Sequence, residues 1–257
     1  VSPAMPDRRR DHHGARRWVH RCEWRRRQKQ ALQASSASPS LPCPTSSFLE
    51  RPLAMPHELD GRGRWLVVRG FCTHDEVCAL EDKLSRHYLR GELLPNPCGP
   101  YRFFAKVDEA PATYVDPLLT KLTSRCERLL ELQGLPADRV LGRTLSLLQP
   151  GGFIHRHRDA YHPTQPGHRP GLDHLRANIV VRLRHPSGRP IIEGEPLSVE
   201  EGDLWAFYAS RSHHETEKVL GSEPRIVVGF GWSVPQHHNL RAPALDASHG
   251  TCVASDT

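Results

Sequence analysis

The residues best suited to carry out chemistry lie in the stretch 149–159, which reads Gln-Pro-Gly-Gly-Phe-Ile-His-Arg-His-Arg-Asp. If this stretch is a β-strand, His157 and Asp159 point to the same face, because side chains two positions apart on a strand share a face. One more imidazole would complete a set of two histidines and one carboxylate, which binds non-haem Fe(II) and leaves coordination positions open. His213 or His214, from a distant strand, can supply that imidazole.

A second histidine precedes the motif and competes with it. His155 lies two residues before His157 and would share its face, and a His-x-Asp tripeptide is a weak signal in a chain with 17 histidines. Only His157 is followed two residues later by a carboxylate. We therefore assign His157 and Asp159 as metal ligands and His155 as a flanking residue.

Arg225 opens the apolar run Arg-Ile-Val-Val-Gly-Phe-Gly-Trp, eleven residues after His214. A lone charge on an interior strand needs a partner. A guanidinium binds a carboxylate in a bidentate manner. We expect Arg225 to meet the carboxylate of a partner group, and the alternative is a surface arginine that follows a turn.

The order His157-x-Asp159, then His214, then Arg225 resembles the Fe(II)/2-oxoglutarate-dependent dioxygenase superfamily. Within it, the chain is most similar to bacterial prolyl-hydroxylase-like and aspartyl/asparaginyl-hydroxylase-like members. The resemblance covers about residues 65–232, and its specific part runs from Pro150 to Trp232.

The resemblance distinguishes between the two adjacent histidines. In the family, a valine follows the second histidine ligand by five positions and precedes a glycine. His214 fits this pattern because Val219 and Gly221 then match. His213 would face the opposite side of the strand.

Further polar residues could complete the cosubstrate site. In the hydroxylases that this chain resembles, an Arg-x-His or Arg-x-Asn pair contacts 2-oxoglutarate or the substrate, and Arg176 and Asn178 match it. A solvated strand edge is the alternative for this pair. The resemblance also implies that Arg225 binds the distal carboxylate of 2-oxoglutarate. Many members have Arg-x-Ser at this position, whereas Val227 stands here. A second hydrogen bond to that carboxylate would then come from Ser146 or Thr144.

The function implied by the resemblance is that of an Fe(II)- and 2-oxoglutarate-dependent hydroxylase. His157, Asp159 and His214 would bind Fe(II), and 2-oxoglutarate and O2 would be consumed with succinate and CO2 as coproducts. Asp159 fills a position that is a small residue in the related halogenases. The expected reaction is hydroxylation of an unactivated C–H bond of an amino acid, peptide or peptide-like metabolite. Desaturation or cyclisation would use the same ligands.

Three other functions compete with this one. A cupin-like metalloenzyme without 2-oxoglutarate would not need Arg225. A metal-binding or structural β-barrel without catalysis would leave the two histidines and the carboxylate unexplained as a set. Demethylases of alkylated nucleic acid carry an Arg-x-Asn-x-Thr-x-Arg signature, which the sequence from Arg225 does not match. Nucleic acid is therefore discounted as a partner, and a small-molecule or peptide substrate is expected; no oligomeric state is assigned.

Charge and composition divide the chain near residue 54. The first 54 residues hold eleven basic and four acidic side chains, a net charge of +7, so the remainder carries −1 of the chain's +6. Arginine clusters alternate there with a Ser/Pro-rich run, and such a composition buries too little apolar surface to offset the entropy of ordering. We expect a disordered extension over 1–54, with a basic arm for nucleic acid or anionic surfaces as the alternative. A dioxygenase domain over 55–235 and a polar tail over 236–257 would follow.

Two helices and a series of short strands are expected in the domain. Thr73 is a plausible N-cap for a helix that runs to about residue 90, and a second helix is expected over 116–134. From residue 140 to 235, short strands recur every 8–12 residues, which is typical of a β-sandwich or barrel. By resemblance, the fold class is mainly β with bracing helices (support helices 73–134) around a double-stranded β-helix, or jelly-roll, core over 140–235. The loop 161–173 is expected to act as a lid.

Seven scattered cysteines without a Cys-x-x-Cys motif argue against a disulfide framework. They are typical of reduced thiols in a cytosol. No run approaches the length of a membrane span. We therefore expect a cytoplasmic protein without a membrane partner.

Overall fold

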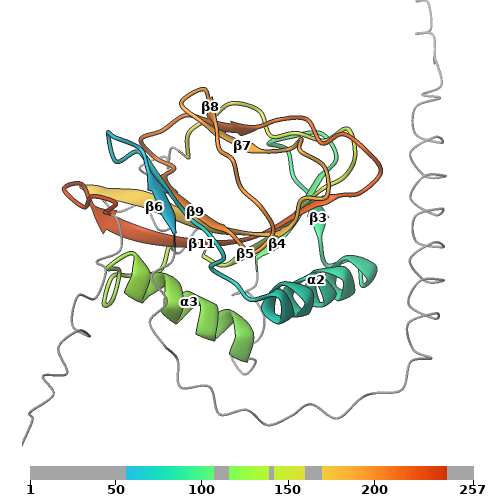
Figure 1. Ribbon diagram of the computed structural model, residues 1–257, viewed down its shortest axis with the longest axis horizontal. Coiled ribbons are helices and arrows are strands. Elements are labelled where there is room, and N and C mark those ends of the chain that lie inside the picture. Colours follow the sequence, from blue (N-terminus) through green and yellow to red (C-terminus); the bar gives the residue numbers. More distant parts are fainter. Residues whose placement is uncertain (1–55, 107–115, 139–141, 160–169, 242–257) are drawn as a thin grey trace, which may run out of the picture. The chain divides into compact units, whose positions relative to one another are not determined.

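The computed structural model describes residues 56–106, 116–138, 142–159 and 170–241. Within them lie two helices and eleven strands (Figure 1). The elements in chain order are β1 (His57–Leu59), β2 (Trp65–Val68), α2 (His74–Leu89), β3 (Leu94–Pro95), β4 (Arg102–Lys106), α3 (Pro117–Leu129), β5 (Thr144–Leu148), β6 (Leu172–Arg182), β7 (Pro190–Ile192), β8 (Glu195–Pro196), β9 (Leu204–Tyr208), β10 (His214–Thr216) and β11 (Arg225–Pro235).

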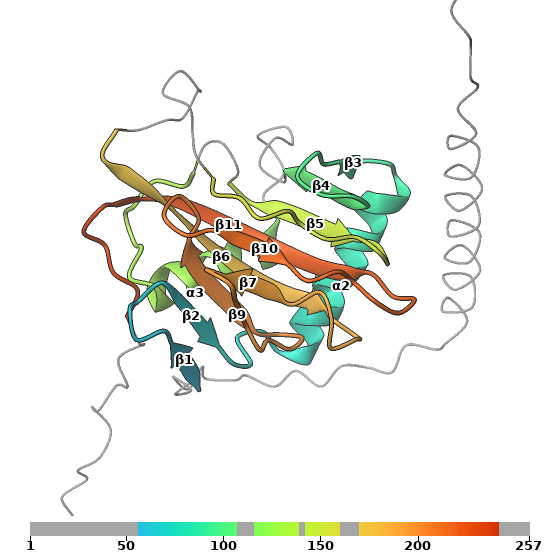
Figure 2. The same ribbon diagram turned by 90° about the horizontal axis from the view of Figure 1, so that it is seen from above.

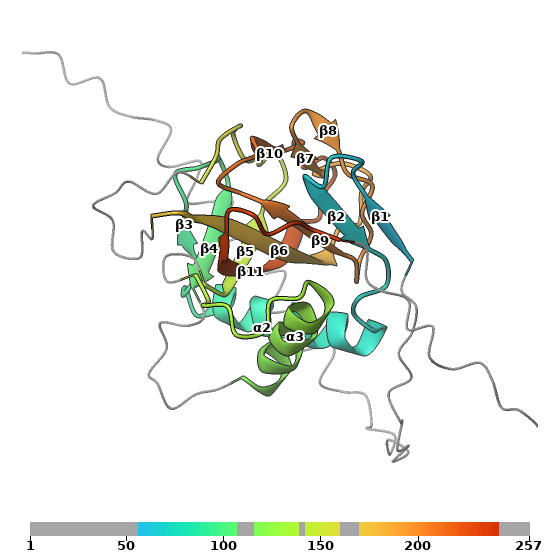
Figure 3. The same cartoon turned by 90° about the vertical axis from the view of Figure 1, so that its left-hand side faces the viewer.

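The strands form two antiparallel sheets that face each other. The larger sheet has the order β1-β2-β9-β6-β11-β5-β4-β3, and the smaller has the order β10-β7-β8. Figures 1 and 3 show the smaller sheet over one face of the larger sheet, with α2 and α3 against the other face. This mainly β architecture with outer bracing helices confirms the predicted jelly-roll fold class.

The long strands β6 and β11 run side by side through the middle of the larger sheet (Figure 2). Between the two sheets, apolar side chains from both form a buried cluster: Trp65, Val67, Val180, Ile192, Leu197, Val199, Trp205, Phe207, Ala209 and Val227. This cluster fixes the separation and register of the sheets, and therefore the position of every side chain on their facing surfaces.

Both helices begin where the sequence predicts. At α2, Thr73 and Glu76 form a reciprocal capping box, and at α3 the side chain of Asp116 accepts a hydrogen bond from the amide of Leu119. Glu76 also receives two hydrogen bonds from the guanidinium of Arg125, both at 2.8 Å. This bidentate pair joins the two helices beneath the sheet.

Several predicted boundaries need correction. The stretch 149–159 is not a regular strand, because its amides donate to scattered partners: Gly151 to the carbonyl of Val219, His155 to that of Cys98, and Asp159 to that of Ala209. The only ladder contact in the described part of this stretch is an isolated bridge between His157 and His214. The second helix, predicted over 116–134, ends at Leu129.

Some predictions fall on residues that the structure does not describe. The extension 1–54, most of the lid 161–173, the start of the predicted core at 140 and the tail beyond 241 lie outside the described residues. Leu172 and Asp173, which the sequence assigned to the lid, belong to β6. In the part of the chain that the structure describes, no helix combines the length and the apolar character needed to cross a membrane.

The contact between α2 and α3 gives a pH-dependent contribution to stability. Burial opposes ionisation of Glu76, but hydrogen bonds from Arg125 and from the amide of Thr73 outweigh it and lower the pKa from 4.5 to about 2. We expect Glu76→Gln to reduce the free energy of unfolding at pH 7 by about 2–3 kcal/mol. Because the folded-state pKa is depressed, this difference should disappear as the pH falls from about 4.5 towards 2.

Urea denaturation of both proteins at several pH values measures this difference. Asp82→Asn, which removes an exposed carboxylate of the same helix, serves as the control and should change stability little. If Glu76→Gln lowers the free energy of unfolding by the same amount down to pH 2, the role of the ionised carboxylate is contradicted.

Candidate metal centre and cosubstrate pocket

Three residues from distant parts of the chain bring their ligand atoms together. His157, Asp159 and His214 place one ligand atom each within 4.8 Å of one another. The amide of His157 donates to the carbonyl of His214 at 3.0 Å, and the amide of His214 donates back at 2.8 Å. Residues paired in this way lie directly opposite each other and share a face. The backbone of the two histidines therefore brings their rings together, with the ring centroids 4.2 Å apart.

Hydrogen bonds to the backbone set the orientation of both imidazoles. Nδ1 of His157 lies 2.7 Å from the carbonyl oxygen of His155, and Nδ1 of His214 lies 3.2 Å from that of Ser212. Each Nδ1 therefore carries the proton, and each Nε2 presents a lone pair. The two Nε2 atoms lie 3.5 and 3.8 Å from Oδ1 of Asp159. This is the donor arrangement that a divalent metal requires.

The two competing histidines point elsewhere. The ring of His155 is exposed and packs edge-on against Phe153, at a centroid distance of 4.8 Å. Nδ1 of His213 lies 3.1 Å from the guanidinium of Arg158, and its ring faces Glu193. His155 still contributes through its carbonyl, which fixes the tautomer of His157.

The charges of the three residues suit metal binding at neutral pH. Burial opposes ionisation of Asp159, but hydrogen bonds from His157 and His174 hold its pKa well below the usual range. Burial lowers the pKa of His214 to about 4, against the attraction of Asp159. When Nε2 of His157 is also protonated, it donates to Asp159, and this raises the pKa of His157 in the metal-free protein. A metal ion would take the place of that proton. An ionised carboxylate beside a neutral imidazole is the state in which these groups bind metals.

The second oxygen of Asp159 is held by residues that the sequence analysis missed. Oδ2 of Asp159 lies 3.3 Å from Nδ1 of His174, and Nε2 of His174 lies 3.2 Å from Oδ2 of Asp138. His174 is 2% exposed and Asp138 is 3% exposed. These buried contacts leave only Oδ1 of Asp159 facing the histidine ligands. The sequence could have indicated His174, since it shares the strand face of Arg176 and Asn178.

A pocket of about 240 Å³ extends from the three candidate ligands between the sheets. All five further residues singled out from the sequence line it: Thr144, Ser146, Arg176, Asn178 and Arg225. The cross-strand register explains this, because Ser146 lies opposite Val227, Gly229 opposite Asn178, and Gly231 opposite Arg176. Directly opposite residues share a face of the sheet.

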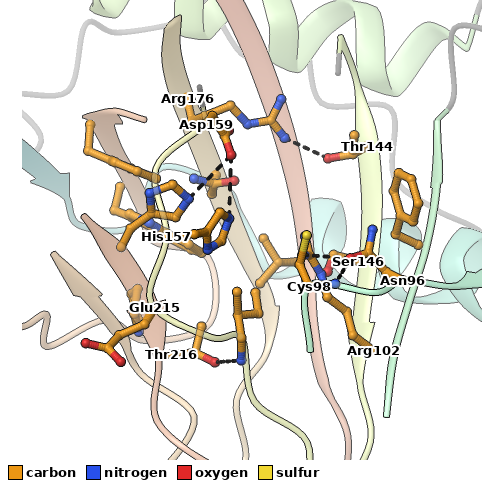
Figure 4. A pocket seen from close by; sticks show the side chains of 18 of the residues that line it. Asn96, Cys98, Arg102, Thr144, Ser146, His157, Asp159, Arg176, Glu215 and Thr216 are labelled. Carbon is orange, nitrogen blue, oxygen red and sulfur yellow. Dashed lines mark hydrogen bonds and ion pairs between the residues drawn. The ribbon is translucent and has the colours of Figure 1, made fainter. Parts of the chain in front are cut away.

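Arg176 and Asn178 are not at a solvated edge, so that alternative is wrong: they are 8% and 9% exposed. Nη2 of Arg176 donates to Oγ1 of Thr144 at 2.9 Å, across β11 (Figure 4). The side chain of Arg176 can cross β11 only because Gly229 and Gly231 have no side chains. A Cβ at either glycine would lie 2.8–2.9 Å from the guanidinium of Arg176.

Arg225 is buried without a counter-ion. It is 4% exposed, its Nε has no hydrogen-bond partner, and none of the described carboxylates forms an ion pair with it. Its guanidinium carbon lies 5.4 Å from the ring centroid of Trp205. Burial, with a smaller effect of Arg102, lowers its pKa to about 9. A buried cation without an anion is costly, so this site is suited to an anionic ligand.

Comparison with known proteins identifies the fold. No family model matches the chain, and no curated protein matches it. Among solved structures, it resembles the epimerase SnoN from nogalamycin biosynthesis, in complex with Fe3+, alpha-ketoglutarate and nogalamycin RO. The TM-score is 0.52 at 15% identity, over 66% of this chain and 79% of that one.

Two prolyl hydroxylases are also similar. The viral collagen prolyl hydroxylase from Paramecium Bursaria Chlorella virus-1, a 2-oxoglutarate complex, gives a TM-score of 0.50 at 11% identity, over 66% of this chain and 95% of that one. A prolyl-4-hydroxylase from Pseudomonas putida gives 0.49 at 20% identity, over 67% and 93%. The epimerase and the viral enzyme establish the architecture: this chain has the fold of the prolyl-hydroxylase-like Fe(II)/2-oxoglutarate-dependent oxygenases.

Proposed function

We propose that this chain is an Fe(II)- and 2-oxoglutarate-dependent dioxygenase that acts as a hydroxylase. The observation that carries the proposal is a single pocket with a His-Asp-His ligand set and a buried arginine that lacks a counter-ion. A metal-binding barrel or a cupin-like enzyme would account for the ligand set alone. Neither would account for the cost of burying Arg225.

The residues present fit the metal. His157, Asp159 and His214 would hold Fe(II) through two imidazole nitrogens and one carboxylate oxygen, a set typical of non-haem iron with open coordination positions. Both Nδ1 atoms and the second oxygen of Asp159 are already satisfied by the protein. The ligand atoms are therefore oriented before any metal arrives.

The residues present also fit the cosubstrate. Arg225 would bind the distal carboxylate of 2-oxoglutarate in a bidentate manner. Ser146 lies directly opposite Val227, the position at which many relatives have serine, so its hydroxyl could replace that serine from the neighbouring strand. Oγ1 of Thr144 already accepts a hydrogen bond from Arg176, which favours Ser146 for this role. Arg176 and Asn178 would line the side of the cosubstrate pocket that β6 forms.

Bound iron and 2-oxoglutarate would supply the oxidising power, with O2 consumed and succinate and CO2 released. The chain itself positions the reactants and excludes water. Phe207 packs on His214 at a centroid distance of 4.8 Å, and Trp205 covers Arg225. These apolar walls strengthen the electrostatic interactions of the ligands that they enclose.

We propose an amino acid, a peptide or a peptide-like metabolite as substrate, with hydroxylation of an unactivated C–H bond as the outcome. This extends the resemblance noted in the sequence and the activity of the viral collagen prolyl hydroxylase. We place the activity in the cytoplasm, on the basis of the scattered cysteines.

Removal of a metal ligand should abolish tight metal binding. Isothermal titration of the apo-protein with Zn(II), a redox-inert stand-in for Fe(II), should give one site per chain. His157→Ala and His214→Ala should weaken it by more than the roughly 10–100-fold that loss of an outer-shell partner costs. His155→Ala and His213→Ala are matched controls and should keep wild-type affinity. Equal weakening by His213→Ala and His214→Ala would contradict the ligand assignment.

His174 and Asp138, which lie behind Asp159, should affect metal binding by holding the carboxylate of Asp159 in position. We expect His174→Gln to weaken Zn(II) binding roughly 10–100-fold, because Oδ2 of Asp159 would lose its imidazole partner. Asp138→Asn should have a smaller effect in the same direction. The visible spectrum of the Co(II)-substituted protein reports ligand geometry and should change in both variants. Unchanged affinity and spectrum in His174→Gln would refute this positioning role.

Loss of the Arg225 side chain should weaken the binding of 2-oxoglutarate specifically. In the Zn(II)-loaded protein, Arg225→Gln should raise the Kd for 2-oxoglutarate at least roughly 30-fold, since one partner of a buried charge pair contributes about 2–5 kcal/mol. Ser146→Ala should raise it roughly 2–10-fold. The apo Arg225→Gln variant should melt no earlier than wild type, because the substitution removes an unpaired buried charge. An unchanged Kd in Arg225→Gln would remove the basis of the proposed function.

A further inference from the structure

A third arginine enters the pocket and has no role in the site described so far. Arg102, the first residue of β4, lines the pocket with Arg176 and Arg225. Its Nη1 donates to Oδ1 of Asn96 at 3.2 Å, and its guanidinium also reaches the side chain of Cys98. Its Nε is buried without a hydrogen-bond partner. None of the carboxylates in the described ranges forms an ion pair with Arg102.

The sheet register places Arg102 and Arg225 at the same level of the pocket but on different sides. Both lie opposite Leu148, one on each side of β5. Their backbones are therefore two strand spacings apart, roughly 10 Å. Arg225 reaches away from β4, over Trp205 of β9. A single carboxylate held by Arg225 beside Trp205 would leave the guanidinium of Arg102 without an anion.

Figure 4 shows what surrounds Arg102. Its guanidinium points into the pocket beside Ser146, Cys98 and Asn96, across the pocket from His157 and Asp159. Glu215 also lines the pocket, but its carboxylate lies on the far side from Arg102. A group bound at Arg102 would therefore face the candidate metal ligands from the opposite wall, where a substrate must lie to react.

The net charge of the pocket also favours an anionic group at Arg102. Three arginines and one inward-facing carboxylate, Asp159, leave an excess of two positive charges. A divalent metal and the dianion 2-oxoglutarate would cancel each other, so this excess would remain. Arg102 is half-buried, with its Nε buried and without a hydrogen-bond partner, and burial lowers its pKa against the attraction of Cys98 and Asp159. An anionic group on the substrate would offset this cost.

We propose that Arg102 binds a carboxylate of the organic substrate and so selects for substrates that carry one near the reacting carbon. This inference rests on the proposed function and deepens it. Among the proposed substrates, it favours a free amino acid, or a peptide that presents a side-chain or terminal carboxylate, over a neutral internal residue. The planar fork of Arg102 suits a carboxylate, which it can bind through two parallel hydrogen bonds.

Binding of a small carboxylate to the loaded protein tests the proposal without turnover. The full-length chain is loaded with Zn(II) and saturated with 2-oxoglutarate, and propionate and propionamide are compared by saturation-transfer NMR. Wild type should bind propionate and not the isosteric amide. Arg102→Gln should weaken propionate binding roughly tenfold or more. Arg102→Lys, which keeps the charge and loses the fork, should bind with intermediate affinity.

Two controls separate this role from others. Arg90→Gln removes an exposed arginine outside the pocket and should bind propionate as wild type does. Arg102→Gln should keep the wild-type Kd for 2-oxoglutarate, in contrast to Arg225→Gln.

Four results would overturn the proposal: no propionate binding to wild type, equal binding to Arg102→Gln, preference for inorganic phosphate, or a loss of 2-oxoglutarate affinity in Arg102→Gln as large as in Arg225→Gln. A wild-type protein that does not bind 2-oxoglutarate would refute the proposed function itself, and this is seen before propionate is added.

Discussion

The burial of Arg225 without a counter-ion is the constraint on which the rest of this pocket depends. A guanidinium moved out of water loses several kcal/mol unless an anion meets it, and none of the described residues supplies one. The fold offsets this cost elsewhere, through a continuous apolar cluster between the sheets and the ring of Trp205 beside the cation. A pocket of this kind is in its most favourable state only when an anionic ligand fills it, which links ligand binding directly to the stability of the barrel.

The candidate metal site depends on a different interaction, the orientation of Asp159. Its two oxygens have separate environments, with Oδ1 near both ligand imidazoles and Oδ2 against His174. The paired backbones of His157 and His214 tie the irregular stretch 149–159 to the smaller sheet, while His174 belongs to the larger sheet. The two sheets must therefore hold their register for the ligand set to exist. The interior cluster and the paired helices behind the larger sheet serve that purpose.

Local patterns in the sequence predicted much of this arrangement, and long-range register supplied the rest. The capping residues at Thr73 and Asp116 and the period of the strands depend on near neighbours, so both helices and the class of fold could be predicted. The spacing of His157 and Asp159 and the apolar run after Arg225 predicted which side chains meet. His174 and Asp138 were missed because they meet partners far away in sequence, and Arg102 was missed because the pairing of β4 with β5 brings it to the pocket. The regular strand predicted over 149–159 was wrong for the same reason, since its amides find several partners in turn.

The most direct test of the central claim is an anaerobic titration of the apo-protein with Fe(II) and then 2-oxoglutarate, followed in the visible spectrum. The claim is that the ligand set and the unpaired arginine form one site, in which 2-oxoglutarate chelates iron. Wild type should develop a metal-to-ligand charge-transfer band that saturates with one equivalent of each. The band should be absent in His214→Ala and should require far more 2-oxoglutarate in Arg225→Gln. A wild-type protein that binds Fe(II) but develops no band would contradict the account and favour a metal centre that does not use 2-oxoglutarate.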